Sequence, residues 1–426
     1  MSAEPGVTPA VIDAGVDAPP SERPPRGRFS AVAGWLHALV LPLLALFSAA
    51  VVGAVVIVAG NRDVVGLLES DPLAGLGAAW SIVIESYAAL IRGSLGDPAQ
   101  LGTALTTLNS AALIDAFHPL SETILSMTPL VFTGLSVALA FRAGLFNIGG
   151  EGQLQMGALA AVFVGFSFQG LPWFIHLPLA LIAALVGGAL WGLIPAVLKA
   201  RTGAHEVITT IMLNFVAVQL VFFSLRSPLF QRPGRSDPIS KVIEPSAVLP
   251  PLVEGLRAHW GIVLALLAAV FVSWLLFRST KGFEFRAVGL NPIAARYAGM
   301  SIGATIVASM MIAGGLAGLG GGVIVLGTTH NLIPALGGGA GFDGIAIALL
   351  GRSKPAGVVA AAFLMGALRA GATPMQVATG TPIYLVTVIQ ALVIMFIAAP
   401  ALVRAIYHIR AERDTGVESF AKGWGA

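Results

Sequence analysis

The chain has 426 residues, of which 56% are hydrophobic and only 11% are charged. Soluble domains carry roughly 25% charged residues, so this chain lacks the polar side chains that would cover a soluble globule. It contains no cysteine, which excludes disulfides, thiol catalysis and cysteine-based metal sites. It also lacks the basic stripe typical of a nucleic-acid-binding protein. The composition therefore predicts an all-α, polytopic membrane protein.

The first 30 residues are rich in Pro, Gly and Ser and offer no apolar face, so residues 1–30 are expected to form a disordered cytoplasmic tail. The apolar run that follows exceeds the roughly 7–15 residues of a signal-peptide core and is expected to be an uncleaved span. A helix needs about 20 apolar residues to cross the hydrocarbon core. With that window the sequence predicts about ten spans, at residues 31–59, 121–141, 154–169, 176–198, 205–225, 258–277, 302–327, 336–350, 355–370 and 382–403.

The stretch between the first two spans, residues 61–120, is mixed in polarity and weakly amphipathic. It suits one or two helices on the periplasmic membrane surface better than another crossing. Residues 31–405 are thus expected to form one transmembrane domain, followed by a cytoplasmic tail over residues 406–426. Most of the 24 Lys and Arg residues fall on one side of these spans, which the positive-inside rule assigns to the cytoplasm together with both termini.

Polar residues and glycines interrupt the apolar pattern in "GLFNIGGEGQLQMG", residues 144–157. Glycines break a regular helix, and non-helical backbone at membrane depth is tolerated only inside protein or beside a water-filled cavity. Asn147, Glu151, Gln153 and Gln155 supply hydrogen-bonding groups for such a backbone. Two interpretations are open: a cytoplasmic turn with solvated polar residues, or a broken helix beside a translocation path.

A second interrupted stretch, "GGGAGFDGIAIALLG" at residues 337–351, repeats the theme in the other half of the chain. Phe342 and Asp343 correspond there to Phe146 and Asn147. Paired Gly-interrupted segments in the two halves of a transporter mark its binding site, so the pattern predicts two pseudo-repeated halves with broken helices near the centre.

Two other stretches have simpler explanations. Glu206, in the first turn of the span at 205–225, complements the helix dipole, whereas Asn214 either holds helices together or lines the path. The glycines of residues 310–327 predict close helix packing. The seven histidines have no metal-ligand spacing, so no metal site is predicted.

The longest cytoplasmic connection, residues 278–301, mixes basic and apolar residues. Pro292 suits the first position of a helix and Gly299 suits its end, so a short helix is expected between them. Its small residues Ala294, Ala295 and Ala298 are expected to form a face that fits a narrow cleft, with Arg296 at the rim. Such a helix could dock a soluble partner or could be an ordinary basic loop.

The chain resembles inner-membrane permeases of ABC transporters of the branched-chain amino acid/simple sugar type, in the nucleoside and simple-sugar subgroup. The resemblance runs from about residue 120 to 405 and is carried by "FRAGLFNIGGEGQLQMGALAA", "EVITTIMLN", "VGLNPIAARYAGM" and "FDGIAIALLGRSKPAGV". In this superclass an Ala-Ala-xxx-Gly pattern forms the helix that couples to the ATPase. Ile293, where many families have Glu, and His205, where Asn is expected, depart from the pattern.

The resemblance implies a permease subunit of an importer in the bacterial inner membrane, with nucleosides or related simple sugars as substrates. Its implied partners are an ABC ATPase subunit that binds the ATP, an extracytoplasmic substrate-binding lipoprotein, and a second permease copy or paralogue. The residues expected to border the substrate path are Phe146, Asn147, Glu151, Asn214, Phe342 and Asp343. Those expected to couple to the ATPase are Pro292, Ala294, Ala295, Arg296 and Gly299.

Other functions are less consistent with the residues. No G-x-x-x-x-G-K-S/T phosphate loop occurs, so energy must come from a partner or an ion gradient. An ion-coupled secondary transporter or channel is the main alternative, but such carriers place ionisable residues in the bundle core. Here the central spans are almost free of acids, and Glu151 and Asp343 are both expected near membrane edges. A membrane enzyme is a weaker alternative, since Ser136 has no histidine placed to activate it.

Overall fold

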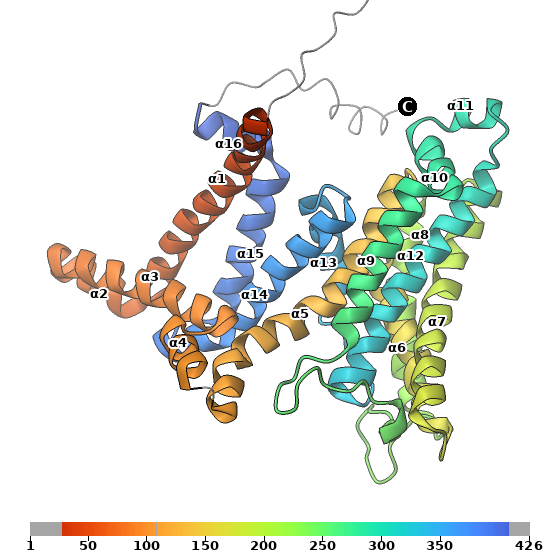
Figure 1. The fold of residues 1–426 in the computed structure, drawn as a ribbon, viewed down its shortest axis with the longest axis horizontal. Coiled ribbons are helices and arrows are strands. Elements are labelled where there is room, and N and C mark those ends of the chain that lie inside the picture. The colour runs from red at the N-terminus through yellow and green to blue at the C-terminus, as the bar shows by residue number, and fades with distance from the viewer. Residues whose placement is uncertain (1–27, 108, 409–426) are drawn as a thin grey trace, which may run out of the picture.

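The computed structural model describes residues 28–107 and 109–408, which form an all-helical protein (Figure 1). The expected tails lie mostly outside these residues, at 1–27 and 409–426. The long helices are α1 (Arg28–Gly60), α3 (Pro72–Leu95), α5 (Ser110–Arg142), α6 (Gly150–Ser167), α7 (Trp173–Thr202), α8 (Glu206–Leu225), α9 (Gly261–Arg278), α12 (Ile302–Ile324), α14 (Pro355–Thr379) and α15 (Ile383–Ala398). The shorter ones are α2 (Arg62–Ser70), α4 (Pro98–Thr107), α10 (Thr280–Leu290), α11 (Pro292–Tyr297), α13 (Ala340–Leu350) and α16 (Pro400–Ile406).

Eight segments of the described chain are long and apolar enough to cross a membrane, and two shorter apolar helices accompany them. Each of the ten expected spans coincides with a helix, although several bounds differ. The ninth expected span ended at residue 370, whereas α14 continues to Thr379. The tenth is divided at Pro400 into α15 and α16, because proline cannot continue the hydrogen-bonding pattern of the preceding helix.

Residues 61–120 contain α2, α3, α4 and the first turns of α5. By length and composition the α3–α4 stretch could cross a membrane. Gly60, at the end of α1, lies beside Leu385, and Gly96, between α3 and α4, lies beside Ala116. Helix α3 contacts α1, and the Tyr87 hydroxyl donates to the Ala50 carbonyl oxygen at 2.7 Å. The placement of this segment on a membrane surface stays a prediction.

Glycine contacts join the central helices α6, α7 and α12. A Cβ atom on Gly157 would lie 2.3 Å from the Cα atom of Gly318, and one on Gly321 would lie 2.0 Å from the Leu154 carbonyl oxygen. No larger side chain fits at such distances, so glycine lets the backbones touch. The packing interpretation of residues 310–327 is confirmed.

The two ends of the bundle carry different structures (Figure 1). Helices α10 and α11 lie at one end, where Arg142, Lys199 and Arg278 close α5, α7 and α9. The connection from α8 to α9, residues 226–260, covers the other end and is fixed there by backbone bonds such as Ser240 N–H to the Leu332 carbonyl. The α8–α9 connection also carries basic residues, among them Arg226, Arg235 and Arg257, so the end of the bundle that faces the cytoplasm stays a prediction.

His259 lies in the connection that covers this other end, just before α9. Its Nδ1 atom accepts a hydrogen bond from the Gly261 N–H at 3.1 Å, and its Nε2 atom lies 3.4 Å from the Thr328 hydroxyl. Burial, with a smaller contribution from His330, lowers the pKa of His259 to about 4. The neutral imidazole is therefore the form that this site holds.

Candidate translocation site and coupling surface

The two glycine-interrupted segments meet inside the bundle. Helix α5 ends at Arg142, and the chain runs without helical structure over residues 143–149 before α6 begins. The first turn of α13 lies against the first turn of α6, where Gly341 N–H donates to Glu151 Oε2 at 2.9 Å. A Cβ atom on Gly341 would lie 2.2 Å from the Glu151 nitrogen, so only glycine allows this approach. The juxtaposition of two helix N-termini is the geometry of a broken-helix site.

This meeting point lies deep in the bundle. Next to it, Gly344 of α13 packs against Thr133 of α5. The helical rise of about 1.5 Å per residue puts Thr133 about 14 Å from Arg142 along α5. Because the hydrocarbon core is about 30 Å thick and Arg142 ends the span, the two helix N-termini lie near the middle of that thickness. The expectation that Glu151 and Asp343 lie near membrane edges is therefore wrong, because α6 and α13 begin inside the bundle and not at its end.

Asn147 organises the non-helical segment from a fully buried position. Its Oδ1 atom accepts the Gly149 N–H at 3.0 Å, and its amide exchanges two hydrogen bonds with Gln153 at 2.9 and 3.2 Å. Buried polar groups of this kind replace the hydrogen bonds that a continuous helix would make. The structure therefore excludes a solvated turn and shows non-helical backbone buried inside the protein, whereas a translocation path beside it stays a prediction.

Asn214 joins α8 to the same segment. Its Oδ1 atom accepts the Gly152 N–H at 2.8 Å, and its Nδ2 atom donates to the Ile148 carbonyl at 2.9 Å. The side chain is buried and both ends of its amide are occupied. Of the two roles open for Asn214, the contacts show the one that holds helices together.

Glu151 links the two helix N-termini. Its Oε2 atom accepts from Gly341, and its Oε1 atom accepts from the Gln155 amide at 3.2 Å. A carboxylate in the first turn of a helix stabilises the positive end of its dipole, and here one buried group lies at two such ends. Glu151 thus fixes α13 against α6.

The residues on the other side of α13 are less covered. Phe342 is 46% exposed, and Asp343 pairs with Arg369 of α14, with about 30% of each side chain exposed. An exposed ion pair at this depth cannot face lipid tails without a large desolvation cost. Sequence reasoning missed Arg369, although its position as the one charged residue between 355 and 379 was a usable signal.

Phe146 and Glu206 lie nearer the α10–α11 end. The Phe146 ring stacks on Phe141 with centroids 4.9 Å apart and is half-buried. Glu206 Oε2 lies 2.6 Å from Lys199 Nζ, and the carboxylate also bonds to the Phe146 backbone. Glu206 therefore ties α8 to α7 and to the non-helical segment, in addition to the dipole role expected from its position.

The expected short helix is present at the α10–α11 end of the bundle. Helix α11 starts at Pro292, and the preceding Asn291 side chain accepts the Ala294 N–H at 3.0 Å. Gly299 has φ +83°, the left-handed conformation that ends a helix at low cost when the residue is glycine. The predicted start and end are confirmed.

The expected small-residue face is wrong at Ala295. Only 4% of Ala295 is exposed, because this side of the single-turn helix packs onto its own chain. The outward side instead presents Ile293 and Tyr297, 70% and 90% exposed, beside Ala294 and Arg296. The surface available to a partner is thus larger and more apolar than the sequence indicated.

The α10–α11 unit touches the start of the non-helical segment directly. A Cβ atom on Gly144 would lie 2.7 Å from the Gly289 Cα atom at the end of α10. On the other side, the Arg142 guanidinium donates to the Ser353 and Arg352 carbonyls at 3.1 and 3.3 Å. These contacts join α10, the end of α5 and the residues after α13 at one point.

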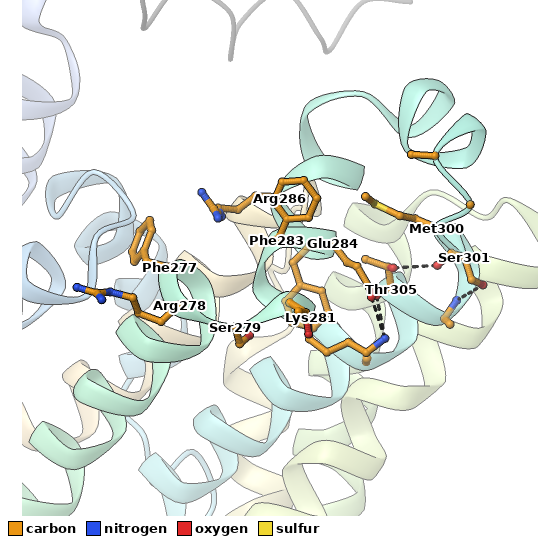
Figure 2. Close-up of a pocket in the computed structure, with 16 residues that line it drawn as sticks. Phe277, Arg278, Ser279, Lys281, Phe283, Glu284, Arg286, Met300, Ser301 and Thr305 are labelled. Carbon is orange, nitrogen blue, oxygen red and sulfur yellow. Dashed lines mark hydrogen bonds and ion pairs between the residues drawn. The ribbon is translucent and has the colours of Figure 1, made fainter.

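A cavity of about 850 Å³ opens between the end of α9, α10 and the start of α12 (Figure 2). Glu284 and Lys281 form an ion pair on its wall at 2.9 Å, and Ser301, just before α12, and Thr305 of α12 line the wall beside them. The cavity lies under the connection that carries α11, so a partner that binds α11 also has access to it.

Comparisons with known proteins agree with this geometry. The family model described as "Branched-chain amino acid transport system / permease component" matches residues 120–398. The guanosine ABC transporter permease protein NupP of Bacillus subtilis is 46% identical over 290 residues, which cover 67% of this chain and 82% of that protein. The glucose ABC transporter permease protein of Haloferax volcanii is 39% identical, over 65% of this chain and 75% of that protein.

A further relative comes from the same Bacillus strain as NupP. The guanosine ABC transporter permease protein NupQ is 30% identical over 57% of this chain and 78% of that protein. No solved structure matches the chain.

Proposed function

Because the chain belongs to the family of branched-chain amino acid transport system permease components, we propose that it is the permease subunit of an ATP-driven importer for nucleosides or related simple sugars. The names of its relatives include both guanosine and glucose as substrates. Both solutes combine hydroxyl groups with a flat ring or sugar face, and a single route with modest polarity suits either class.

The observation that carries this proposal is the partly exposed ion pair of Asp343 and Arg369 beside the joined N-termini of α6 and α13. Charged groups at mid-membrane depth mark substrate pathways. Phe342 offers its ring on the same side for stacking against a base or a sugar face. We place the solute route along this face of α13 and α14, with Phe146 near its cytoplasmic end.

The buried members of the predicted path set have a supporting role in this proposal. Asn147, Glu151 and Asn214 hydrogen-bond to the backbone of the broken segment or of α13 and keep the route open at a fixed width. Weak contacts with the solute suit an importer whose separate receptor selects the solute, because tight binding in the route would slow release.

The α10–α11 end is assigned to the cytoplasm, with both termini on that side and the ATPase docked on Ile293, Tyr297 and their neighbours. The substrate-binding lipoprotein is assigned to the opposite end, over residues 226–260. Single cysteines introduced into this cysteine-free chain test the orientation in intact, wall-permeabilised cells. An impermeant thiol reagent should label position Ser236 and spare Ser301, and the reverse pattern would contradict the assignment.

A second permease completes the route in this proposal. The face that carries Phe342 and the Asp343–Arg369 pair is half-exposed in the single chain, and a symmetric or pseudosymmetric neighbour would enclose it. Bacillus subtilis has two proteins named guanosine ABC transporter permease, both similar to this chain. We therefore favour a paralogue as the neighbour over a second copy.

Force from the ATPase is proposed to enter through α10. Its Gly289 contacts Gly144 at the start of the non-helical segment, so a movement of the α10–α11 unit would shift the residues leading to Asn147. The contact is backbone to backbone, which transmits displacement with little slack.

Uptake assays in proteoliposomes test the function directly. Radiolabelled guanosine and ribose are supplied with the receptor, and the permease is reconstituted with or without its ATPase and neighbouring permease. Uptake should require the ATPase subunit, and it should require ATP on the side of the liposome membrane where the ATPase is bound. Uptake by this chain alone, driven by a proton or sodium gradient, would support the secondary-transporter alternative instead.

A further inference from the structure

Three arginines gather around the ring of Phe277, at the end of α9. The Cζ atoms of Arg142 and Arg286 lie 5.7 and 5.6 Å from the ring centroid, and Arg278 is the next residue in the chain. Figure 2 shows the Phe277 ring between the head groups of Arg278 and Arg286, on the side of α10 away from Met300 and Thr305. The three side chains come from α5, α9 and α10, so the fold brings them together.

These guanidinium groups have no carboxylate partner among residues 28–107 and 109–408. The ion pairs of the described chain join other residues, and Glu284, the acidic residue of α10, is held by Lys281. Carbonyl groups accept two hydrogen bonds from Arg142 and one from Arg286, which leaves most of the five donors of each guanidinium unused. The cluster thus has charge and donors available for an anion.

The cluster lies where the headgroups of a bilayer would be. Helix α9 has 18 residues, or about 27 Å, and ends at Arg278, so its length is close to the thickness of the hydrocarbon core. Val270, Trp274 and Phe277 are exposed at helical spacing and form an outward apolar stripe that runs up to the arginines. Trp274 near the end of the stripe is typical of a membrane interface.

We propose that this cluster binds the phosphate group of an anionic phospholipid, with an acyl chain lying along the α9 stripe. Arginine is suited to this ligand because its planar guanidinium offers paired donors to phosphate oxygens and stacks on an aromatic ring at the same time. Basic groups between helices on the cytoplasmic side of membrane proteins recognise anionic headgroups in this way. The site is separate from the proposed solute route and does not depend on the identity of the solute.

The test measures lipid binding by the full-length protein. Protein delipidated in a neutral detergent is titrated with palmitoyl-oleoyl phosphatidylglycerol or with phosphatidylcholine of the same chains, and bound lipid is counted by native mass spectrometry. The wild type should prefer phosphatidylglycerol. Each Arg278→Gln or Arg286→Gln change should weaken that binding about fivefold, since a basic group near an anionic surface contributes about that factor.

The matched control is Arg201→Gln. Arg201 is exposed at the same end of the bundle and makes no ion pair in the described chain, so the change removes the same charge away from Phe277. Normal lipid binding by this variant would support a local site, whereas an equal loss would show only a general attraction of basic residues and would overturn the proposal. Arg286→Lys should bind more weakly than the wild type but better than Arg286→Gln, because lysine keeps the charge and loses the planar fork.

Two further outcomes would assign the cluster to another ligand. Saturation of the site by inorganic phosphate, with equal displacement of phosphatidylglycerol, would show that acyl chains play no part. Loss of ATPase co-purification by the Arg278→Gln, Arg286→Gln double variant, with phosphatidylglycerol binding unchanged, would show that the cluster meets an acidic protein surface. Thermal unfolding of each variant in detergent confirms that binding is compared between folded proteins.

Discussion

Replacing Glu151 tests whether its role is hydrogen bonding or charge. In Glu151→Ala, Gly341 N–H and the Gln155 amide both lose their acceptor in a buried position. Hydrogen bonds to charged groups contribute about 1.5–3 kcal/mol each, whereas polar contacts between membrane helices average about 0.6 kcal/mol and reach about 1.7. Because both donors are buried and would stay unpaired, we expect the free energy of unfolding to fall by about 2–4 kcal/mol.

Glu151→Gln should behave differently. A glutamine can present its Oε1 atom to Gly341 N–H and its amide group to Gln155. Gln155 can then turn its own Oε1 atom, which has no hydrogen-bond partner at present, toward that amide. The exchange leaves the Gln155 Nε2 group without an acceptor in place of its Oε1 atom, so Gln155 keeps one unpaired end as in the wild type and the expected cost is under about 1 kcal/mol.

The assay compares thermal unfolding in detergent, followed by fluorescence-detected size exclusion, with ATP-dependent uptake by the reconstituted transporter. Glu151→Ala should unfold at lower temperature and lose uptake, and Glu151→Gln should be close to the wild type in both. A folded Glu151→Gln protein without uptake would refute this reasoning, because it would show that the carboxylate must carry or exchange charge. That result would also favour ion coupling over an ATP-driven permease.

Three more predictions concern the route, the coupling surface and the loop at the opposite end. The Asp343→Asn change, which removes the negative charge, should lower uptake by roughly tenfold, equivalent to about 1.4 kcal/mol. The double variant Asp343→Arg, Arg369→Asp, which exchanges the two charges, should restore part of the uptake. Equal uptake by the wild type and all variants would contradict a role for the pair. Tyr297→Ala should reduce ATPase co-purification without lowering thermal stability. Gly299→Val should lower the free energy of unfolding by roughly 1–2 kcal/mol or more, because valine is strained in the left-handed conformation that this position adopts. Normal co-purification of the ATPase with both variants would show that it docks elsewhere. The pKa of His259 is lowered to about 4 from an ordinary 6.5, so the unfolded chain binds more protons than the folded chain between these pH values. The contribution of His259 to the free energy of unfolding should be full above pH 6.5 and should fall by roughly 3 kcal/mol as the pH drops to 4. A His259→Gln variant should lack this part of the pH dependence.

Hydropathy and glycine patterns predicted most of the helices but not all of their ends. Each expected span falls on a helix, because crossing a membrane requires a long apolar run, but the eight segments long and apolar enough to cross also include Pro72–Thr107, which the sequence placed on a membrane surface. It ended the ninth span at residue 370, whereas α14 continues through Pro374 to Thr379. Arg369 therefore lay near the predicted end of a span, and the positions of the spans alone could not predict its ion pair with Asp343.

Orientation about a helix axis was the information that the sequence lacked. Ala295 looked available because a six-residue helix offers no periodicity from which to tell its inner side, and that side is set by packing on its own chain. The same limit applied to Asn147 and Asn214, whose polarity identified a special site without showing whether they face the protein or the route. Local signals, such as Pro292 and Gly299 at the ends of α11, were sufficient because capping depends on neighbouring residues alone.

The division between buried and exposed polar groups explains how a site with an interrupted helix can still be rigid. A gap in a membrane helix frees backbone groups that must be satisfied inside the protein, and Asn147, Glu151 and Asn214 do this with side chains that have little exposure. Since these groups are occupied by the backbone, they are poor candidates for direct contact with a passing solute. In the function proposed here, direct contact with the solute is assigned to Phe342 and the Asp343–Arg369 pair, which the same framework holds at the edge of the bundle.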